Sequence, residues 1–305
     1  MTDIPTPANQ RANSLTHEST DQLLHMVKQQ LTDETFDHQD RQLIGQMVEC
    51  LGDTRGLVRL GFAEALGVVG KPAVDTLIEA LLHHPNAVVR RAAGKTLTLI
   101  EDPVAVPHLI HALLNDEDTV VQASAIGALA RTGIASVAPL LEVLASPDSS
   151  ESNKGHAAWG LAFIGVEAKD KLYQAYSSDS SAVRAAVVGA IAKIALEDSS
   201  DTQALDLLVG ALQDSVTDIR REAAAVLSNL KYQPAIHVLY ELLQHSDAET
   251  RKLAALSLMK IGDRQAVSKL QTALERENDQ NTEKAIALSI SLLQKQPPAS
   301  LEDDW

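Results

Sequence analysis

Five side chains that could bind a flat ligand or move a proton fall within one short stretch of the sequence. Trp159 and Phe163 are four residues apart and share a helix face, and His156 lies three residues before Trp159 on the same side. Tyr173 and Tyr176 follow on the next predicted helix. Only 3% of the chain is aromatic, so this grouping is unusual for this sequence. Exposed aromatic side chains are typical of binding sites for proteins and planar ligands, and His156 or a tyrosine could assist as an acid.

A second set of polar side chains recurs on the later helix of each predicted helix pair. Imidazoles and carboxylates can ligate zinc or iron. Neither their spacing nor their number is diagnostic of a metal site, so a solvated polar groove is the favoured interpretation and no metal is expected. The position before an Ala-Leu step, or its equivalent, is occupied in order by Glu79, His111, Glu142, Gln174, Gly210, Glu241 and Thr272.

Arginine recurs at one equivalent position of the earlier helices, after a polar turn. Stacked units would bring each guanidinium beside a carboxylate of the neighbouring turn and so fix the register of the repeats. Direct ligand binding is the alternative. Gln122 and Lys154 interrupt the series. The predicted ladder residues are Arg59, Arg90, Arg184, Arg220 and Arg251.

Motifs for common catalytic chemistry fail on inspection. Gly94-Lys95-Thr96 resembles the end of a phosphate loop, but Val89 stands where the required glycine would be, and the segment is predicted to be helical. His17-Glu18 lacks the second histidine of a zinc protease. Cys50 is the only cysteine, so it forms no internal disulfide, which agrees with a reducing compartment. The sequence indicates no nucleotide, serine nucleophile or catalytic zinc.

The charge and apolar composition exclude two further classes of protein. The chain has 26 Lys and Arg against 41 Asp and Glu, a net charge of -15, which disfavours nucleic acid as a partner. Its apolar residues are mainly Ala, Leu, Val and Ile, which favours packed helices. No apolar run reaches the roughly 18 residues of a membrane span, and Met1–Gln10 lacks the order of a signal peptide. We therefore expect a cytoplasmic protein.

The elements that position these residues repeat every 30 to 36 residues, which is typical of a solenoid. Residues 88–100 and 106–114 are predicted to form one helix pair, and glycines and Asp-rich turns mark the helix ends. Residues 20–32 and 40–51 are expected to form a divergent first pair, and residues 282–294 a last helix. Each unit contains a leucine-like residue seven positions after the ladder residue: Leu66, Leu97, Leu129, Leu161, Ile191, Leu227 and Leu258.

The repeat register leaves two hypotheses for the aromatic side chains. The positions of Trp159 and Phe163 hold charged residues such as Glu64 and Lys260 in other units, which favours exposure. However, the inserted segment Ala145–Asn153 could fold over the rings and make them part of a local core. Both hypotheses stay open at the level of sequence.

The units Val88–Asp116 and Thr250–Leu274 resemble the short HEAT-like repeats of E/F-type phycobilin lyases. The segment Gly155–Leu161 is similar to the Ala-Ala-Trp-x-Leu-Gly helix of that family, although Ala162 stands where a glycine is usual. The resemblance implies attachment of a bilin to, or its removal from, a phycobiliprotein in a cyanobacterial cytoplasm or plastid stroma. It implies a phycobiliprotein subunit and a second lyase-type subunit as partners, with a transient phycocyanobilin-type bilin and no covalently bound cofactor.

We therefore predict an all-α, right-handed α-solenoid of about seven to eight HEAT-like helix pairs over residues 19–294. Disordered tails are expected over residues 1–18 and 295–305. The protein is predicted to bind another protein and to assist the attachment of a bilin to, or its removal from, a phycobiliprotein. Whether it catalyses that reaction stays open at the level of sequence. The alternative is a noncatalytic scaffold or an assembly factor, for example for iron–sulfur clusters or a photosystem.

Overall fold

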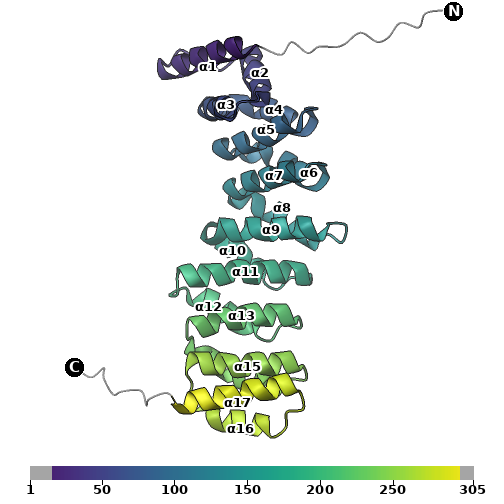
Figure 1. Ribbon diagram of the computed structural model, residues 1–305, viewed down its shortest axis with the longest axis vertical. Coiled ribbons are helices and arrows are strands. Elements are labelled where there is room, and N and C mark those ends of the chain that lie inside the picture. The colour runs from purple at the N-terminus through teal and green to yellow at the C-terminus, as the bar shows by residue number, and fades with distance from the viewer. Residues whose placement is uncertain (1–15, 296–305) are drawn as a thin grey trace, which may run out of the picture. The chain divides into compact units, whose positions relative to one another are not determined.

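A computed structural model describes residues 16–295, and all regular secondary structure within that range is helical (Figure 1). The predicted tails lie largely outside these residues, although α1 already begins at His17. The described chain forms two compact units, divided between Thr132 and Gly133. This division falls inside the third predicted helix pair, between its two helices. The all-helical prediction is confirmed.

The first unit contains three and a half helix pairs and matches the predicted elements closely. The pair expected over residues 88–100 and 106–114 differs from the observed helices by one residue at an end. The pair expected over residues 20–32 and 40–51 is also present, but its first helix begins three residues earlier and its second ends two residues earlier than predicted. The helices are α1 (His17–Thr32), α2 (Arg41–Glu49), α3 (Gly56–Val69), α4 (Val74–His83), α5 (Ala87–Ile100), α6 (Val106–Asn115) and α7 (Thr119–Arg131).

The second unit continues the same alternation of earlier and later helices and ends with the single helix predicted near residue 282. Its helices are α8 (Ile134–Ala145), α9 (Glu151–Ile164), α10 (Lys169–Ala175), α11 (Ser181–Glu197), α12 (Thr202–Ala211), α13 (Thr217–Asn229), α14 (Ile236–Leu242), α15 (Ala248–Ile261), α16 (Ala266–Leu274) and α17 (Gln280–Lys295). Counting from α3 to α16 gives the seven predicted pairs.

Turn chemistry sets the helix boundaries. The Asp118 carboxylate accepts hydrogen bonds from the amides of Val120 and Val121, so it satisfies two N–H groups at the start of α7. At the other end of a helix, Gly262 adopts φ 88° after α15, a conformation that costs a glycine little. The predicted Asp-rich caps and glycine stops are confirmed at these positions.

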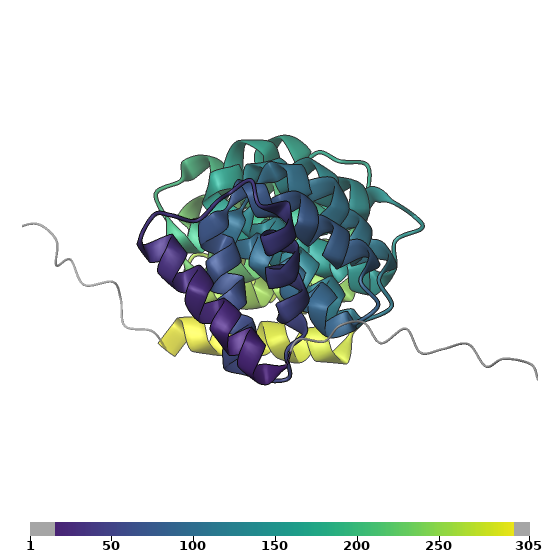
Figure 2. The same cartoon turned by 90° about the horizontal axis from the view of Figure 1, so that it is seen from above.

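The helices of each unit form two layers (Figures 1 and 2). In the first unit, α5 packs against its fellow earlier helices α3 and α7, while α4 packs against α6 in the other layer and against α5 across the layers. In the second unit, α11 packs against α9 and α13, and α15 against α17. All seven predicted leucine-like residues are buried between these helices. Burial of this repeated apolar position is what requires each pair to stack on a neighbour.

Candidate functional site

Two aromatic side chains form an exposed pair on α9. Trp159 is 51% exposed and Phe163 is 47% exposed, and their ring centroids lie 5.4 Å apart with 32° between the planes. The hypothesis that segment Ala145–Asn153 buries these rings is wrong. Because α9 begins at Glu151, only a short loop remains of that segment, and Trp159 lies about 12 Å farther along the helix axis.

A lysine from the next earlier helix completes this surface. The Nζ atom of Lys193, on α11, lies 6.0 Å from the Phe163 ring centroid and donates a hydrogen bond to the Ala162 carbonyl at 2.9 Å. It also lies 3.7 Å from Oε1 of Glu197. We call Trp159, Phe163 and Lys193 the aromatic patch. Sequence reasoning did not select Lys193, although its register was a usable signal: it occupies in α11 the position of Phe163 in α9.

The two predicted tyrosines do not join the aromatic patch. Tyr173 is buried, and its hydroxyl donates to Asp201 at 3.0 Å. Burial, with Asp201 nearby, raises its pKa well above the usual range, so it is a poor acid. Tyr176 is half-buried, with its hydroxyl close to Gly210 of α12. The structure thus directs both side chains toward the neighbouring helix pair, because α10 turns this face to α12.

His156, the predicted acid on α9, is only partly exposed. Its Nδ1 atom is buried and has no hydrogen-bond partner among the described residues. Of the five residues that the sequence groups together, only Trp159 and Phe163 are largely exposed. His156 lies on the same helix as these two rings.

The second set of polar side chains, which recurs on the later helices, is exposed to solvent at every position. Glu79 and His111 belong to the first unit, and the members from Glu142 to Thr272 belong to the second. Across residues 16–295, no group of three or more His, Cys, Asp or Glu side chains is arranged to hold a metal ion. These side chains are therefore separate, solvated polar groups in each unit.

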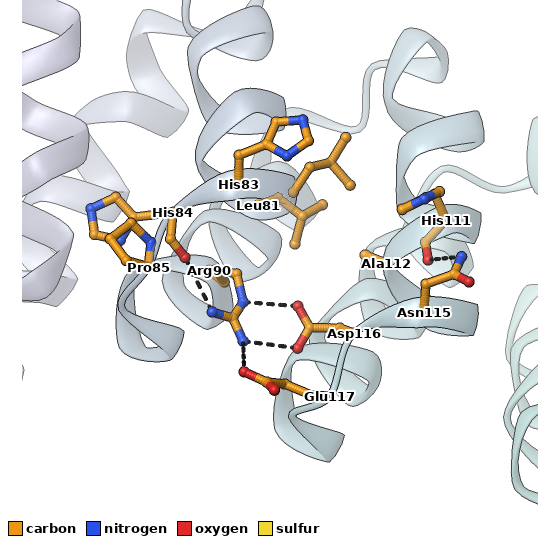
Figure 3. Close-up of a pocket in the computed structure, with 11 residues that line it drawn as sticks. Leu81, His83, His84, Pro85, Arg90, His111, Ala112, Asn115, Asp116 and Glu117 are labelled. Atoms are coloured by element: carbon orange, nitrogen blue, oxygen red, sulfur yellow. Dashed lines mark hydrogen bonds and ion pairs between the residues drawn. The ribbon is translucent and has the colours of Figure 1, made fainter.

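His111 does line a hollow in the first unit, with a volume of about 390 Å³ (Figure 3). Figure 3 shows the ion pair of Arg90 and Asp116 bridging its two sides, with the rings of His83 and His111 on the same side of that bridge. Asn115 donates to the His111 carbonyl at 2.9 Å. The bridge leaves the Arg90 guanidinium fully engaged by protein groups.

An equivalent hollow of about 220 Å³ occurs in the second unit. It is bordered by His245, Arg251, Ala273 and Glu277, the counterparts of His84, Arg90, Ala112 and Asp116. The hollow therefore recurs because equivalent repeat positions and turn residues line it in both units. What distinguishes the first-unit hollow is the pair of imidazoles, since Gln244 replaces His83.

Three of the predicted ladder arginines make the same two contacts. The guanidinium donates two hydrogen bonds to the carboxylate of the next turn, and it also donates to the backbone carbonyl six residues before it. The pairs are Arg90 with Asp116 and the His84 carbonyl, Arg184 with Asp214 and the Ser178 carbonyl, and Arg251 with Glu277 and the His245 carbonyl.

Other members of the series keep only part of this arrangement. Arg220 donates to the Asp214 carbonyl and reaches both Asp247 and Thr250. Arg59 donates to the Asp53 carbonyl, and no carboxylate partner for it occurs in the described chain, because the next turn carries His84-Pro85 where others carry an acid. Gln122 likewise keeps the carbonyl contact alone, at 2.8 Å to Asp116.

Lys154, the second interruption, pairs with Glu151 on its own helix and takes no part in the carbonyl contact. The arginines in this series point into the turns, and all except Arg59 also pair with a carboxylate of the next turn. Their geometry supports a structural role over ligand binding.

The pH dependence of stability at Glu277 tests the contact between a ladder arginine and the carboxylate of the next turn, which we call the joint. Its side chain is buried and accepts hydrogen bonds from Arg251 and from the amides of Asn278 and Asp279, which lowers its pKa from 4.5 to about 2. Its contribution to stability is therefore complete above about pH 4.5 and is lost as the pH falls toward 2. We expect Glu277→Gln to lower the free energy of unfolding by about 1.5–3 kcal/mol at pH 7.

The measurement is urea unfolding of both proteins at pH 7 and at pH 3. The difference between wild type and Glu277→Gln should shrink at the lower pH, where other carboxylates titrate equally in both chains. An unchanged difference at pH 3 would show that the Glu277 charge is unimportant to this joint.

Comparison with models of protein families matches HEAT repeats over residues 29–130, 137–228 and 205–291. Among curated proteins, the chain is 35% identical over 287 residues to bilin biosynthesis protein MpeU of Synechococcus sp. strain WH8020, covering 93% of this chain and 96% of that protein. It is 22% identical over 204 residues to uncharacterized phycocyanin operon protein Z of Pseudanabaena tenuis strain PCC 7409, covering 64% of this chain and 83% of that protein.

One similar solved structure is the complex of CpcE and CpcF of phycocyanin lyase from Nostoc sp. PCC7120. The identity is 19%, the match covers 61% of this chain and 99% of that chain, and the TM-score is 0.31. This likeness concerns the fold alone. Among residues 16–295, the helices are each too short or too polar to cross a membrane.

Proposed function

Because this chain belongs to the HEAT-repeat family and is a homologue of bilin biosynthesis protein MpeU, we propose that it holds an open-chain tetrapyrrole while the pigment is attached to or removed from a phycobiliprotein. The observation that carries the proposal is the exposed pair of Trp159 and Phe163 in a chain with few aromatic residues. The organism of the 35% identical relative supports a cyanobacterial cytoplasm as the setting.

The aromatic patch has the chemistry that a bilin requires. The flat conjugated pyrrole rings can stack on the indole and phenyl faces, which otherwise remain in water. Lys193 places a cation beside Phe163, where it can pair with a propionate of the pigment. Lys193 now pairs weakly, at 3.7 Å, with Glu197, so a propionate would have an available ammonium group to contact.

The addition itself needs no nucleophile from this chain. A cysteine thiol of the acceptor protein adds across a carbon–carbon double bond of the bilin: the sulfur bonds to one carbon and a proton is added to the other. Cys50 is unsuited to that role, because burial raises its pKa to about 11. His156, one turn before Trp159, is the group on α9 that could donate the proton.

Added phycocyanobilin tests this proposal through its visible absorption spectrum. We expect the wild-type chain to shift and sharpen the absorption band, and Trp159→Ala to weaken pigment binding about tenfold, as expected for about 1.4 kcal/mol of lost ring contact. Lys193→Ala should weaken binding less. Matched controls are Leu256→Ala and Lys260→Ala, which change the equivalent repeat positions on α15 and should leave binding unchanged.

A pull-down with the tagged chain separates pigment handling from scaffolding. The proposed partners are a phycobiliprotein subunit and a second lyase-type subunit. If the pigment spectrum is unaffected by the wild-type chain while protein partners are still retained, the chain is a noncatalytic scaffold. Equal effects of Trp159→Ala and Lys260→Ala on the spectrum would place the pigment elsewhere.

A further inference from the structure

The ladder is structural as a series, but one member, Arg59, makes only half of the usual contacts. Its Nη1 atom donates to the Asp53 carbonyl at 2.5 Å, and the same atom makes the same backbone contact in the three complete joints. In those joints the other edge of the guanidinium, formed by Nε and Nη2, donates both of its hydrogen bonds to one carboxylate. Within residues 16–295, Nε and Nη2 of Arg59 have no acceptor, and we call these two atoms the open edge.

The turn that faces Arg59 explains why this edge has no carboxylate. His84 occupies the turn position, six residues before the next ladder residue, that an acid occupies in each complete joint. Its Nδ1 atom accepts a hydrogen bond from the Asn86 amide at 3.0 Å, so its Nε2 atom is a donor and lies 3.4 Å from Glu49. The His84 ring therefore offers the guanidinium of Arg59 no acceptor.

A second histidine turn shows how the chain fills the same position from within. His245 stands in the turn that faces Arg220, and its Nδ1 atom likewise accepts from the amide two residues on, that of Asp247. Nε and Nη2 of Arg220 then donate to the Thr250 hydroxyl at 3.0 and 2.7 Å, and Nη2 lies 3.2 Å from Asp247. Arg59 has neither an acid nor a hydroxyl at these positions. The corresponding residues of its turn are Asn86 and Val89.

The surroundings of the open edge suit an anion. Arg59 is partly exposed, and its Nη1 contact holds the guanidinium in the orientation seen in the complete joints. Oδ1 of Asn86 accepts from the Val88 amide, which leaves its Nδ2 atom as a second donor beside the turn at Gly52. The acids of the two turns are already paired. These pairs are Asp53 with Arg55 and Glu49 with His84.

We propose that the open edge of Arg59 is a binding site for a carboxylate that an aspartate or glutamate of a partner protein supplies. The three complete joints define this chemistry, because the same two guanidinium atoms bind a carboxylate in each of them. One such pair alone is expected to hold a free carboxylate with a Kd of only about 10–100 mM. The carboxylate therefore has to arrive with further contacts, as it does on the surface of a bound protein.

The complete joints also indicate how the partner presents its acid. In each of them the carboxylate accepts a hydrogen bond from the amide two residues on, which orients it toward the guanidinium. An acidic residue that opens a turn has this geometry. The site lies in the first unit and uses no residue of the aromatic patch, so its test is independent of pigment binding.

The probe is the peptide N-acetyl-Asp-Ala-Ala amide, in which the amide of the second alanine can orient the aspartate. Binding to the full chain is followed by the Nε–H resonances of ¹⁵N-labelled arginine, and the Arg59 signal is assigned with Arg59→Lys. We expect this signal to move saturably, with half-saturation at about 10–100 mM peptide, while the signals of Arg90, Arg184 and Arg251 stay in place. N-acetyl-Asn-Ala-Ala amide, or sodium chloride of equal ionic strength, should leave the Arg59 signal unmoved.

Two histidine-to-aspartate variants test the geometry from within the chain. His84→Asp should give Arg59 the carboxylate that its turn lacks. We therefore expect its folding equilibrium constant in urea unfolding to rise about three- to tenfold, and the peptide no longer to move the Arg59 signal. The matched control is His245→Asp, which should change stability little because Arg220 already has acceptors. Circular dichroism verifies that each variant is folded.

Three results would overturn the proposal. The first is an Arg59 signal that the Asp and Asn peptides move equally, or that neither moves. The second is a change of that signal in Asp3→Asn without peptide, which would make the one acidic residue of segment 1–15 the occupant. The third is movement by micromolar phycocyanobilin but not by the peptide, which would make the pigment the source of the carboxylate.

Discussion

Arg90→Ala is expected to lower the free energy of unfolding by about 3–5 kcal/mol. Arg90 is buried, and its guanidinium contacts the Asp116 carboxylate at 2.8 and 3.1 Å and the His84 carbonyl at 3.1 Å. The Asp116 side chain is only 8% exposed. The substitution therefore leaves a charge without its cation in a place that water reaches poorly, which is the costly way to break an ion pair.

Urea unfolding followed by circular dichroism measures this change, and amide hydrogen exchange at the turn of residues 116–118 locates it. The control is Arg131→Ala, which removes an arginine that is 54% exposed and paired with the exposed Glu101. That variant should lose no more than about 1 kcal/mol. If both variants lose equal stability, the buried joint at Arg90 contributes nothing beyond a surface ion pair.

Phe62→Ala and Phe163→Ala should have opposite consequences, although they remove the same side chain. Phe62 is fully buried in the first unit, so its removal is expected to cost about 3–5 kcal/mol of stability. Phe163 is about half exposed, and its removal should change stability by less than about 1 kcal/mol. We expect Phe163→Ala instead to weaken pigment binding several-fold.

Thermal and urea unfolding of both variants, together with pigment titration, provide the comparison. Pigment binding by Phe62→Ala should be unaltered under conditions where the variant remains folded. A loss of several kcal/mol on Phe163→Ala would indicate that its ring acts as core, and would remove the main support for the aromatic patch.

The repeat could be predicted from the sequence because its physical cause is local. A leucine-like residue at a fixed interval, with a glycine or aspartate at each turn, sets both the helix boundaries and the face that is buried. Leu97 and Leu161 therefore lie where their spacing predicts. The contact between Arg90 and the acidic turn of the next unit follows from the same register.

The candidate sites were less accessible to sequence reasoning. Spacing places Trp159 and Tyr173 on consecutive helices, but it does not say that α10 turns Tyr173 toward Asp201. The hollow beside His83 and His111 depends on how two turns meet, which no single-helix pattern contains. The contact of Lys193 with the Phe163 ring depends on the packing of α11 on α9, which the sequence pattern of one helix does not show.

The contact between a ladder arginine and the carboxylate of the next turn has an evolutionary consequence. Both halves of that joint are encoded within about one repeat length, so a duplicated cassette carries with it the means of attachment to its neighbours. Gain or loss of a whole cassette would preserve the remaining joints. A change of one turn residue would likewise alter only the joint that contains it. Within such a lineage, protein length can thus change by steps of a single cassette while the helices that carry a binding surface retain their local packing.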